Sequence, residues 1–214
     1  ESCEGWRFAG GGDRLKLLNI SNWGVFRSTA SGTFQGSRNM TCSAVDVPLY
    51  APANMIYAFR DCRSFNGAIG NWDVSNITDL QAAFYDCRVF NQDLSAWDVS
   101  NVTNLIETFF WANEFNGDVS TWNTSNIRTL YRTFSRTAFN GDLSGWDVSN
   151  VVSLDNTFAI SYLNNNSIAN WDVSNVADMR ATFANTPFNH DLSSWNTSGV
   201  TRMQSMFSSS GFDN

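Results

Sequence analysis

Carboxylate and amide side chains recur along this sequence in a spacing that could bind a cation. Asp93, Asp118, Asp142 and Asp191 each follow an asparagine by two residues and lie about 25 residues, or twice that, apart. Calcium takes oxygen ligands of this kind. An Asn-x-Asp turn, however, satisfies its own backbone groups without a metal. We therefore expect no cofactor and keep calcium binding through these aspartates as the alternative.

Two further sets of polar residues recur at the same interval. The asparagines are Asn76, Asn101, Asn126, Asn150 and Asn175, and the threonines are Thr108, Thr133, Thr157 and Thr182. A row of amides could bind a sugar, but unpaired amides cost about 1–3 kcal/mol when buried, so we expect them to form a ladder of hydrogen bonds to the backbone. The threonines could order ice on a flat face or bond back within a helical turn. We favour structural roles for both sets.

Residues suited to catalysis are sparse. The only histidine, His190, stands at a turn position that other repeats fill with Gly or Gln, and no partner residues can be argued around it. Paired carboxylates could hydrolyse a glycosidic bond. The aspartates here recur from repeat to repeat, as structural residues do. The sequence predicts a non-enzymatic protein, with a carbohydrate-active enzyme as the weaker alternative.

Asn-X-Ser/Thr sequons permit glycosylation of a secreted chain. Asn76 and Asn101 belong to the expected ladder and are predicted to be poor acceptors. Asn123 and Asn196 replace an outward aspartate of the repeat, so they are the first candidates. The other candidate acceptors are Asn19, Asn39 and Asn165.

The elements that must position these residues come from a repeat of 24 to 25 residues. One column of large apolar residues is Trp72, Trp97, Trp122, Trp146, Trp171 and Trp195. A second is Phe59, Phe84, Phe109, Phe134, Phe158, Phe183 and Phe207. A period in this range is typical of solenoids, in which each coil buries its apolar face against its neighbours.

Within one repeat, the pattern predicts a short strand followed by a short helical turn. Trp97 and Val99 alternate with Asp98 and Ser100, as in a strand with one buried face. The segment 104–109 then spaces Leu and Phe four residues apart, as in one or two turns of helix. The predicted fold class is an α/β solenoid, similar to leucine-rich repeats, with a strand and a helical turn in each coil.

The repeated phrase, as in FNQDLSAWDVSNVTNL at 90–105, resembles the BspA-like surface proteins with leucine-rich-type repeats. The resemblance covers residues 46–214. It implies a solenoid related to leucine-rich repeats, display on the cell surface, and a role in adhesion or contact. The chain departs from that pattern by using Leu more often than Met in the second half of the repeat, and by a degenerate coil at 161–168.

The cysteine spacing predicts an oxidised protein. Cys62 and Cys87 lie one repeat apart, so stacked coils would bring their backbones to about 4.8 Å, within the range of a disulfide. By elimination Cys3 pairs with Cys42, which suits an extracellular compartment. Free or metal-bound thiols are the alternative, but the chain has neither CxxC spacing nor nearby histidines.

The chain is expected to be one domain, with a capping segment at 1–45 and the repeats at 46–214. Trp6, Phe8, Trp23, Phe26 and Phe34 supply apolar surface for the cap. The formal net charge is -7, and the arginines are scattered along the sequence. These features argue against nucleic acid as a partner. No apolar run in the sequence approaches the roughly 18–20 residues that a membrane span needs, which argues against membrane insertion.

The sequence predicts a secreted or cell-surface protein that acts in structure and assembly, or in adhesion. The sequence stops at Asn214 in the middle of a repeat, so either the chain continues beyond it, or a protein partner or self-association covers the uncapped C-terminal coil. Filaments and a monomeric adhesive domain both remain open. A calcium- or glycan-binding recognition domain is the alternative function, and an ice-binding protein is a weaker one.

Overall fold

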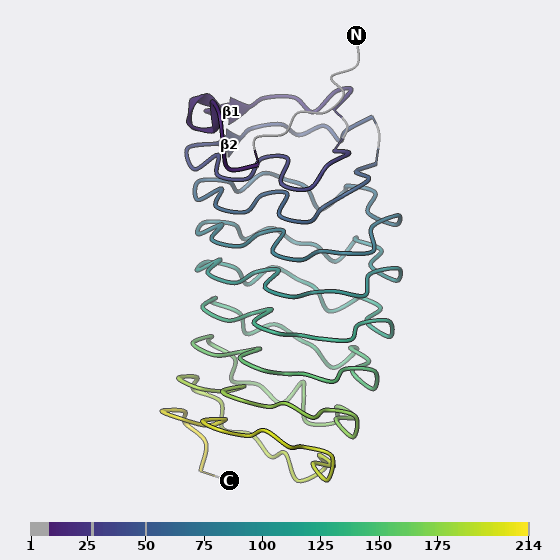
Figure 1. Cartoon of the computed structure of the whole chain (residues 1–214), viewed down its shortest axis with the longest axis vertical. Coiled ribbons are helices and arrows are strands. Elements are labelled where there is room, and N and C mark those ends of the chain that lie inside the picture. Colours follow the sequence, from purple (N-terminus) through teal and green to yellow (C-terminus); the bar gives the residue numbers. More distant parts are fainter. Residues whose placement is uncertain (1–8, 27, 50, 214) are drawn as a thin grey trace.

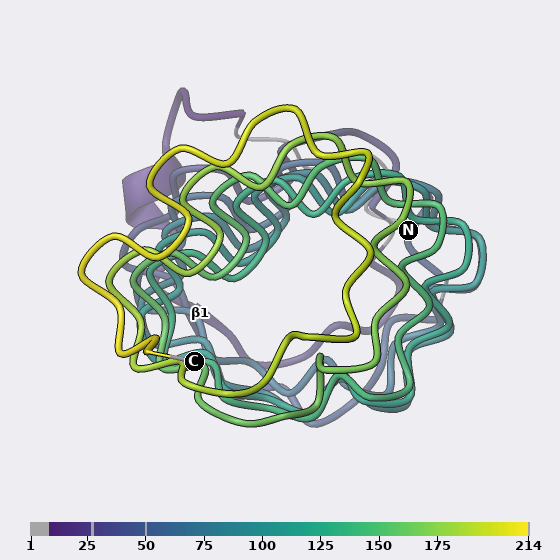
Figure 2. The same ribbon diagram turned by 90° about the horizontal axis from the view of Figure 1, so that it is seen from below.

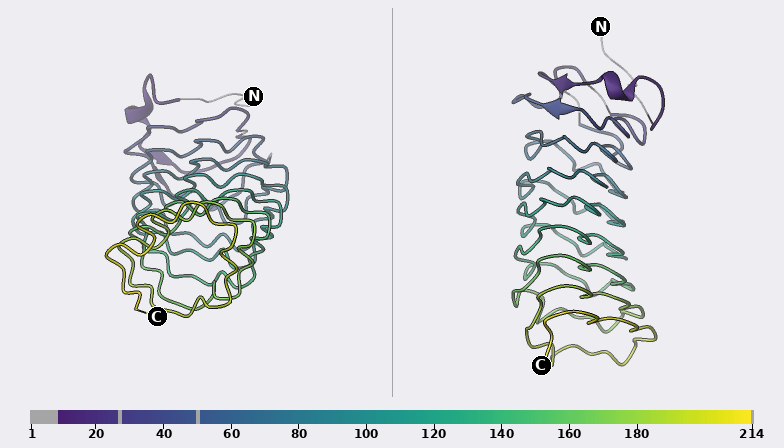
Figure 3. Two further views of the ribbon diagram at one scale, coloured as in Figure 1. Left: turned by 60° about the horizontal axis from the view of Figure 1, so that its bottom comes forward. Right: turned by 90° about the vertical axis from the view of Figure 1, so that its left-hand side faces the viewer.

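The chain forms coils that stack along one long axis. The computed structural model describes residues 9–26, 28–49 and 51–213. The coils follow one another in sequence order, from the purple end to the yellow end (Figure 1). Viewed along the axis, each coil closes a rounded ring, and the rings lie over one another (Figure 2). Two further views show the same stack (Figure 3).

Regular secondary structure is confined to the first coils. The elements are the 3-10 helix η1 (Arg14–Lys16) and the strands β1 (Asn19–Ile20) and β2 (Thr41–Cys42). β1 and β2 pair in parallel, with Asn19 opposite Thr41. The predicted α/β solenoid, similar to leucine-rich repeats with a strand and a helical turn in each coil, is therefore wrong. The described residues contain no α-helix and no strand beyond these two.

Turns replace the predicted helical segments because alternate amides bond in different directions. Ala82 and Phe84 donate their N–H groups to the next coil, at Ile106 and Thr108. Ala83 donates instead to Leu80, three residues back in its own coil. An α-helix would direct every amide to the fourth residue back. The stack thus satisfies half of these amides between coils.

Residues in the left-handed backbone region interrupt the helical pattern at two positions of each coil. The first set is Tyr57, Ala82, Glu107, Arg132, Asn156, Ala181 and Ser205, and the second is Asp61, Asp86, Trp111, Arg136, Ile160, Asn185 and Ser209. This conformation costs about 1–2 kcal/mol for a residue with a Cβ, so it cannot continue a right-handed helix.

Ile160 is the residue least suited to this conformation, because it is β-branched and has φ 60°. We expect Ile160→Asn to raise the free energy of unfolding by about 1 kcal/mol, since Asn tolerates left-handed angles. Asn185 occupies the same position one coil later with φ 55°. Urea unfolding measures the change. Ile160→Val keeps the β-branch and is the control, so an equal gain in both variants would contradict the explanation.

The predicted columns form continuous stacks inside the coils. Phe109 lies between Phe84 and Phe134, with ring centroids 5.6 and 5.7 Å apart. Trp122 lies 6.4 Å from Trp97 and 6.0 Å from Trp146, in near-parallel planes. The in-and-out alternation of the repeat is confirmed even though no strand forms there. Trp97 and Val99 are buried, and Asp98 is exposed.

A ladder of indole hydrogen bonds fixes the tryptophan column. The indole N–H of Trp97 donates to the carbonyl of Ile69 at 2.9 Å, and that of Trp122 donates to Leu94 at 3.0 Å. Trp146, Trp171 and Trp195 repeat the pattern. Each of these five indoles therefore joins two successive coils in addition to its packing, whereas the buried indole N–H of Trp72 has no partner among the described residues.

The stacking begins before residue 46. Phe34 donates its N–H to the carbonyl of Ala58, and its ring stacks on Phe59 at 5.3 Å. Asp46 caps the turn at Trp23 by accepting the N–H groups of Trp23 and Gly24. Part of the expected cap thus continues the repeat pattern. Cys3, Trp6 and Phe8 lie outside the described residues.

The predicted disulfide between Cys62 and Cys87 is absent, and Cys42, Cys62 and Cys87 are free thiols. Cys62 donates its thiol hydrogen to the carbonyl of Phe34, and Cys87 donates to Phe59. Stacked side chains run parallel, which leaves their Cβ atoms about 4.8 Å apart, whereas a disulfide brings them to about 3.8 Å. Burial raises the pKa of both thiols.

Candidate functional site

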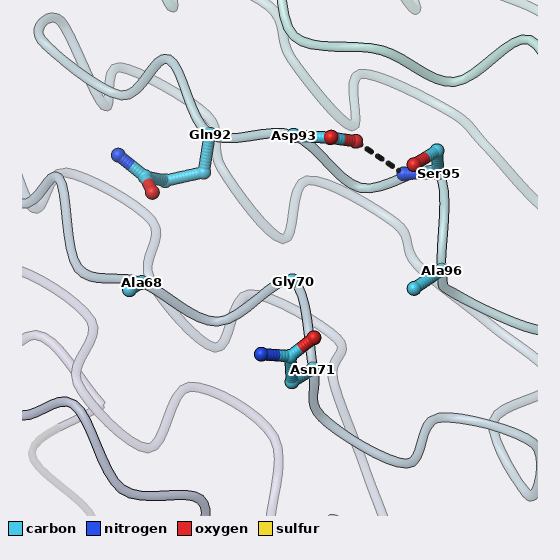
Figure 4. Close-up of a pocket in the computed structure, with 7 residues that line it drawn as sticks. All are labelled: Ala68, Gly70, Asn71, Gln92, Asp93, Ser95 and Ala96. Atoms are coloured by element: carbon cyan, nitrogen blue, oxygen red, sulfur yellow. Dashed lines mark hydrogen bonds between the residues drawn. The ribbon is translucent and has the colours of Figure 1, made fainter.

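The aspartates proposed for calcium each close a local turn. Asp93 accepts the N–H of Ser95 at 2.8 Å, and Asp118, Asp142 and Asp191 accept the same bond from the serine two residues on. Asp93 borders a small open pocket with Gln92 and Asn71 (Figure 4). In the described part of the chain, no three acidic, histidine or cysteine residues gather to hold a metal ion. The turn explains these aspartates without a ligand.

The asparagine ladder is present from Asn101 to Asn175. Asn101 donates its Nδ2 hydrogens to the carbonyl of Ser75, and Asn126, Asn150 and Asn175 repeat this bond one coil later each time. Nδ2 is also the atom that a glycan would modify. Asn123 and Asn196 instead accept, through Oδ1, the hydroxyl hydrogen of the serine two residues on, and both are exposed. Their glycosylation stays a prediction.

The other candidate acceptors hold polar partners as well. The side chain of Asn19, in β1, donates to the hydroxyl of Ser43, and that of Asn39 donates to the carbonyl of Leu15. Asn165 donates to the side chain of Asn140.

The threonine column presents no surface to ice. Thr108, Thr133, Thr157 and Thr182 are completely buried. Thr108 donates its hydroxyl hydrogen to backbone carbonyls, including that of Leu80 in the preceding coil at 3.1 Å. The column therefore joins coils inside the stack.

The most distinctive surface lies beside the phenylalanine column, where the repeat is least regular. We define the arginine–aromatic face by the outward residues Tyr57, Arg60, Arg63, Tyr85, Arg88, Phe110, Trp111, Tyr131, Arg132 and Arg136. Most of these side chains are half-buried, and Trp111 and Arg136 are exposed. Several of these residues have the left-handed backbone described above, including Tyr57, Trp111 and Arg132. Several residues of the arginine–aromatic face therefore belong to the turns described above.

Guanidinium groups alternate with rings along the stack axis. The Cζ of Arg60 lies 5.4 Å from the ring centroid of Tyr57 in its own coil and 4.1 Å from that of Tyr85 in the next coil. Arg132 lies in the same way between Phe110 and Tyr131, at 5.3 and 4.8 Å. Tyr85 contacts Phe110 edge-on at 5.2 Å, which joins the two groups. Each such cation–ring contact contributes about 0.5–1 kcal/mol at an exposed site.

Trp111 completes the network at its exposed edge. Its ring lies within 5.8 Å of the Cζ of Arg88 and within 5.0 Å of that of Arg136. Asp86 is buried and accepts a hydrogen bond of 2.7 Å from each of Arg63 and Arg88. Among the described residues, no carboxylate lies within ion-pair distance of Arg136. Arg136 therefore keeps its charge available at the surface.

An open groove of about 700 Å³ continues the face toward the C-terminal coils. Tyr131, Arg132, Asn156 and Arg180 line it. Arg180 donates to Asp155 and Asp178, each at 2.8 Å. Burial alone would raise the pKa of Asp178, but the hydrogen bonds and charge of Arg180 lower it below its ordinary value. The groove wall is thus a neutralised arginine cluster.

Charge is divided between the two sides of each coil. The outer segments beside the phenylalanine column, from 54–63 to 202–210, carry seven arginines and six carboxylates. The intervening segments, from 64–78 to 188–201, carry nine carboxylates and a single arginine. The arginines that are scattered in sequence are therefore gathered in space. Their recurrence near the column phenylalanines was the signal that could have revealed this.

Comparison with known protein families assigns most of the chain to one family. The family described as "Mycoplasma protein of unknown function, DUF285" matches residues 53–168 and 136–214. The chain belongs to this family. No curated protein and no solved structure matches this DUF285 member. None of the described residues belongs to a helix that could cross a membrane.

Proposed function

We propose that this DUF285 protein is a non-enzymatic contact protein of the cell surface, acting in adhesion or assembly, and that it docks through the arginine–aromatic face. The connected network of arginines and rings from Tyr57 to Tyr131 carries the proposal. Trp, Tyr and Arg are the residues most enriched at the energetic centres of protein interfaces. The stack holds them on a surface that spans several coils.

Glycan binding is less well supported at this surface. Sugars stack on the open faces of aromatic rings, and the closest guanidinium groups here lie over those faces. Arg60 lies over Tyr85, and Arg132 over Tyr131. What remains outward are ring edges and N–H donors, which suit carboxylates and polar groups of a protein partner.

Binding of the purified full chain to intact cells that produce it tests the proposal. We expect the labelled wild-type chain to bind these cells, as measured by flow cytometry. We expect Arg132→Glu/Arg136→Glu to bind about tenfold more weakly, because two negative charges replace two positive charges of the docking surface and repel the groups that those cations attract. The variant loses the contacts of Arg132 with Phe110 and Tyr131 and its ion pair with Glu107, so thermal unfolding is measured in parallel and binding is compared at a temperature at which both chains are folded.

The matched control is Lys16→Glu, which makes the same type of charge change on an exposed residue of η1. It should bind as the wild type does. A wild-type chain that does not bind the cells, or a face variant that binds as well as the control, would contradict the proposal.

A further inference from the structure

The side of each coil opposite the arginine–aromatic face carries a row of aspartates. Trp97 packs against Phe84 across the core, with ring centroids 6.0 Å apart, so the segments bearing these two residues lie on opposite sides of the ring. Asp98 follows Trp97 and points outward. We call Asp73, Asp98, Asp147 and Asp172, each next to a column tryptophan, the aspartate row.

The side chains of the aspartate row point outward and are fixed by local turns. Asp73 and Asp98 each accept the backbone N–H of the serine two residues on, Ser75 and Ser100, at 3.1 and 3.0 Å. Hydrogen bonds from these serines lower the pKa of both carboxyl groups. Among the described residues, no arginine or lysine forms an ion pair with the row. Within the part of the chain that the structure describes, these carboxylates therefore have hydrogen-bond partners but no cationic partner.

The two surfaces share one axial period, because both belong to the same coils. In the coils of Phe59 and Phe84, Arg60 and Arg88 stand across from Asp73 and Asp98. The coil of Phe134 has Arg132 and Arg136 on one side and Asp147 on the other.

The intermediate coil, that of Phe109, lacks both charges. It carries Phe110 and Trp111 on the face, and Asn123 replaces the aspartate on the opposite side. The gap in the arginines thus coincides with the gap in the aspartates.

The arginines of the face also pair within the chain, since Arg60 lies 3.9 Å from Asp61, Arg63 and Arg88 share Asp86, and Arg132 binds Glu107. Two positive charges remain in excess, one where two arginines share Asp86 and one at Arg136. Farther along, Arg180 lies between two carboxylates, those of Asp155 and Asp178, which leaves no positive excess there, and its coil carries Asn196. Asp172 has no arginine in its own coil.

We infer that copies of this chain associate side by side, with the arginine–aromatic face of one copy against the aspartate row of the next. A neighbour shifted sideways, without rotation or axial displacement, aligns each arginine with the aspartate of the same coil across the four coils from Phe59 to Phe134. Trp111 then meets Asn123. The inference rests on the proposed function and names its partner.

This contact joins two different surfaces, so it is heterologous and does not close on itself. Each added copy presents a fresh aspartate row on its far side, and growth gives a single layer of parallel stacks. The contact is electrostatic and solvent-accessible, so salt should weaken it. The Debye length falls from about 30 Å at 0.01 M ionic strength to about 3 Å at 1 M.

Sedimentation velocity of the full chain tests the inference with two complementary variants. The face variant is Arg132→Glu/Arg136→Glu. The row variant is Asp98→Asn/Asp147→Asn, which keeps the turn because Asn123 accepts the same bond from Ser125. At low salt the wild type should form species that grow with concentration and dissociate at high salt. Each variant alone should stay monomeric, or associate at least about tenfold more weakly.

A mixture of the two variants gives the sharpest outcome. The face variant keeps an intact aspartate row, and the row variant keeps an intact arginine–aromatic face. One productive contact is then possible, so the mixture should form dimers of one copy of each and nothing larger. Lys16→Glu should associate as the wild type does.

The results separate this inference from the proposed function. A wild type that stays monomeric at low salt, association that neither variant weakens, or assemblies larger than dimers in the mixture would overturn the inference. If the face variant still loses cell binding in that case, the face docks another partner and the proposed function stands. If cell binding is also unchanged, both fail.

Discussion

Replacing Phe109 with alanine should lower the free energy of unfolding by about 3–5 kcal/mol. Phe109 is completely buried. Its ring stacks between Phe84 and Phe134 and lies 3.8 Å from that of Phe115. Alanine leaves a cavity that the flanking coils can fill only by changing their spacing, and hydrogen bonds between coils oppose that change. Urea unfolding followed by tryptophan fluorescence measures the loss.

Phe110→Ala is the matched control, since Phe110 is the next residue in the chain and is half-buried on the outer face. It loses contacts with Tyr85 and Arg132 but leaves no enclosed cavity. We expect a loss below about 1.5 kcal/mol, near the value of an exposed aromatic pair. Equal losses for the two variants would show that the phenylalanine column is not the main source of stability.

The apolar columns could be predicted from the sequence because their period is independent of local conformation. A residue that recurs once per coil stacks on its copies whether the coil is built from strands, helices or turns. Trp97 and Val99 are buried and Asp98 is exposed, as the alternation indicates. The secondary structure of each coil could not be predicted from the sequence in the same way. The spacing of Leu105 and Phe109 fits a helix, but the N–H of Glu107 bonds to Tyr131 in the next coil.

The arginine–aromatic face could not be predicted from the aligned repeats for a related reason. Its arginines occupy no single position of the repeat, and the positions that they do occupy hold other residue types in other coils, so an alignment of the repeats shows them only as variation. Arg60 follows its column phenylalanine by one residue, Arg88 by four, and Arg132 precedes its own by two. Their side chains converge because long guanidinium groups reach rings in neighbouring coils. A repeat protein keeps its frame in the regular positions, and binding residues gather where that regularity ends.

The close spacing of the coils leads to a second large effect. Gly117 is buried, and a Cβ added there would overlap the carbonyl oxygen of Gln92 in the preceding coil. Its φ is not in the left-handed region, so the obstacle is the neighbouring backbone rather than strain at Gly117 itself. We expect Gly117→Ala to lower the free energy of unfolding by about 3 kcal/mol, the upper range for overpacking that moves the backbone.

Gly145→Ala is the control for a glycine that contacts the preceding coil less closely. Its Cβ would lie 3.1 Å from the carbonyl oxygen of Ser120, a contact that a shift of a few tenths of an ångström relieves. Its loss should stay below about 1 kcal/mol. Urea unfolding compares the two variants. Because the Asn116 side chain next to Gly117 accepts the N–H of Asn140, the clash should also weaken the contact with the following coil. If Gly117→Ala were as stable as Gly145→Ala, the coils could separate at little cost, and the columns alone would hold the stack.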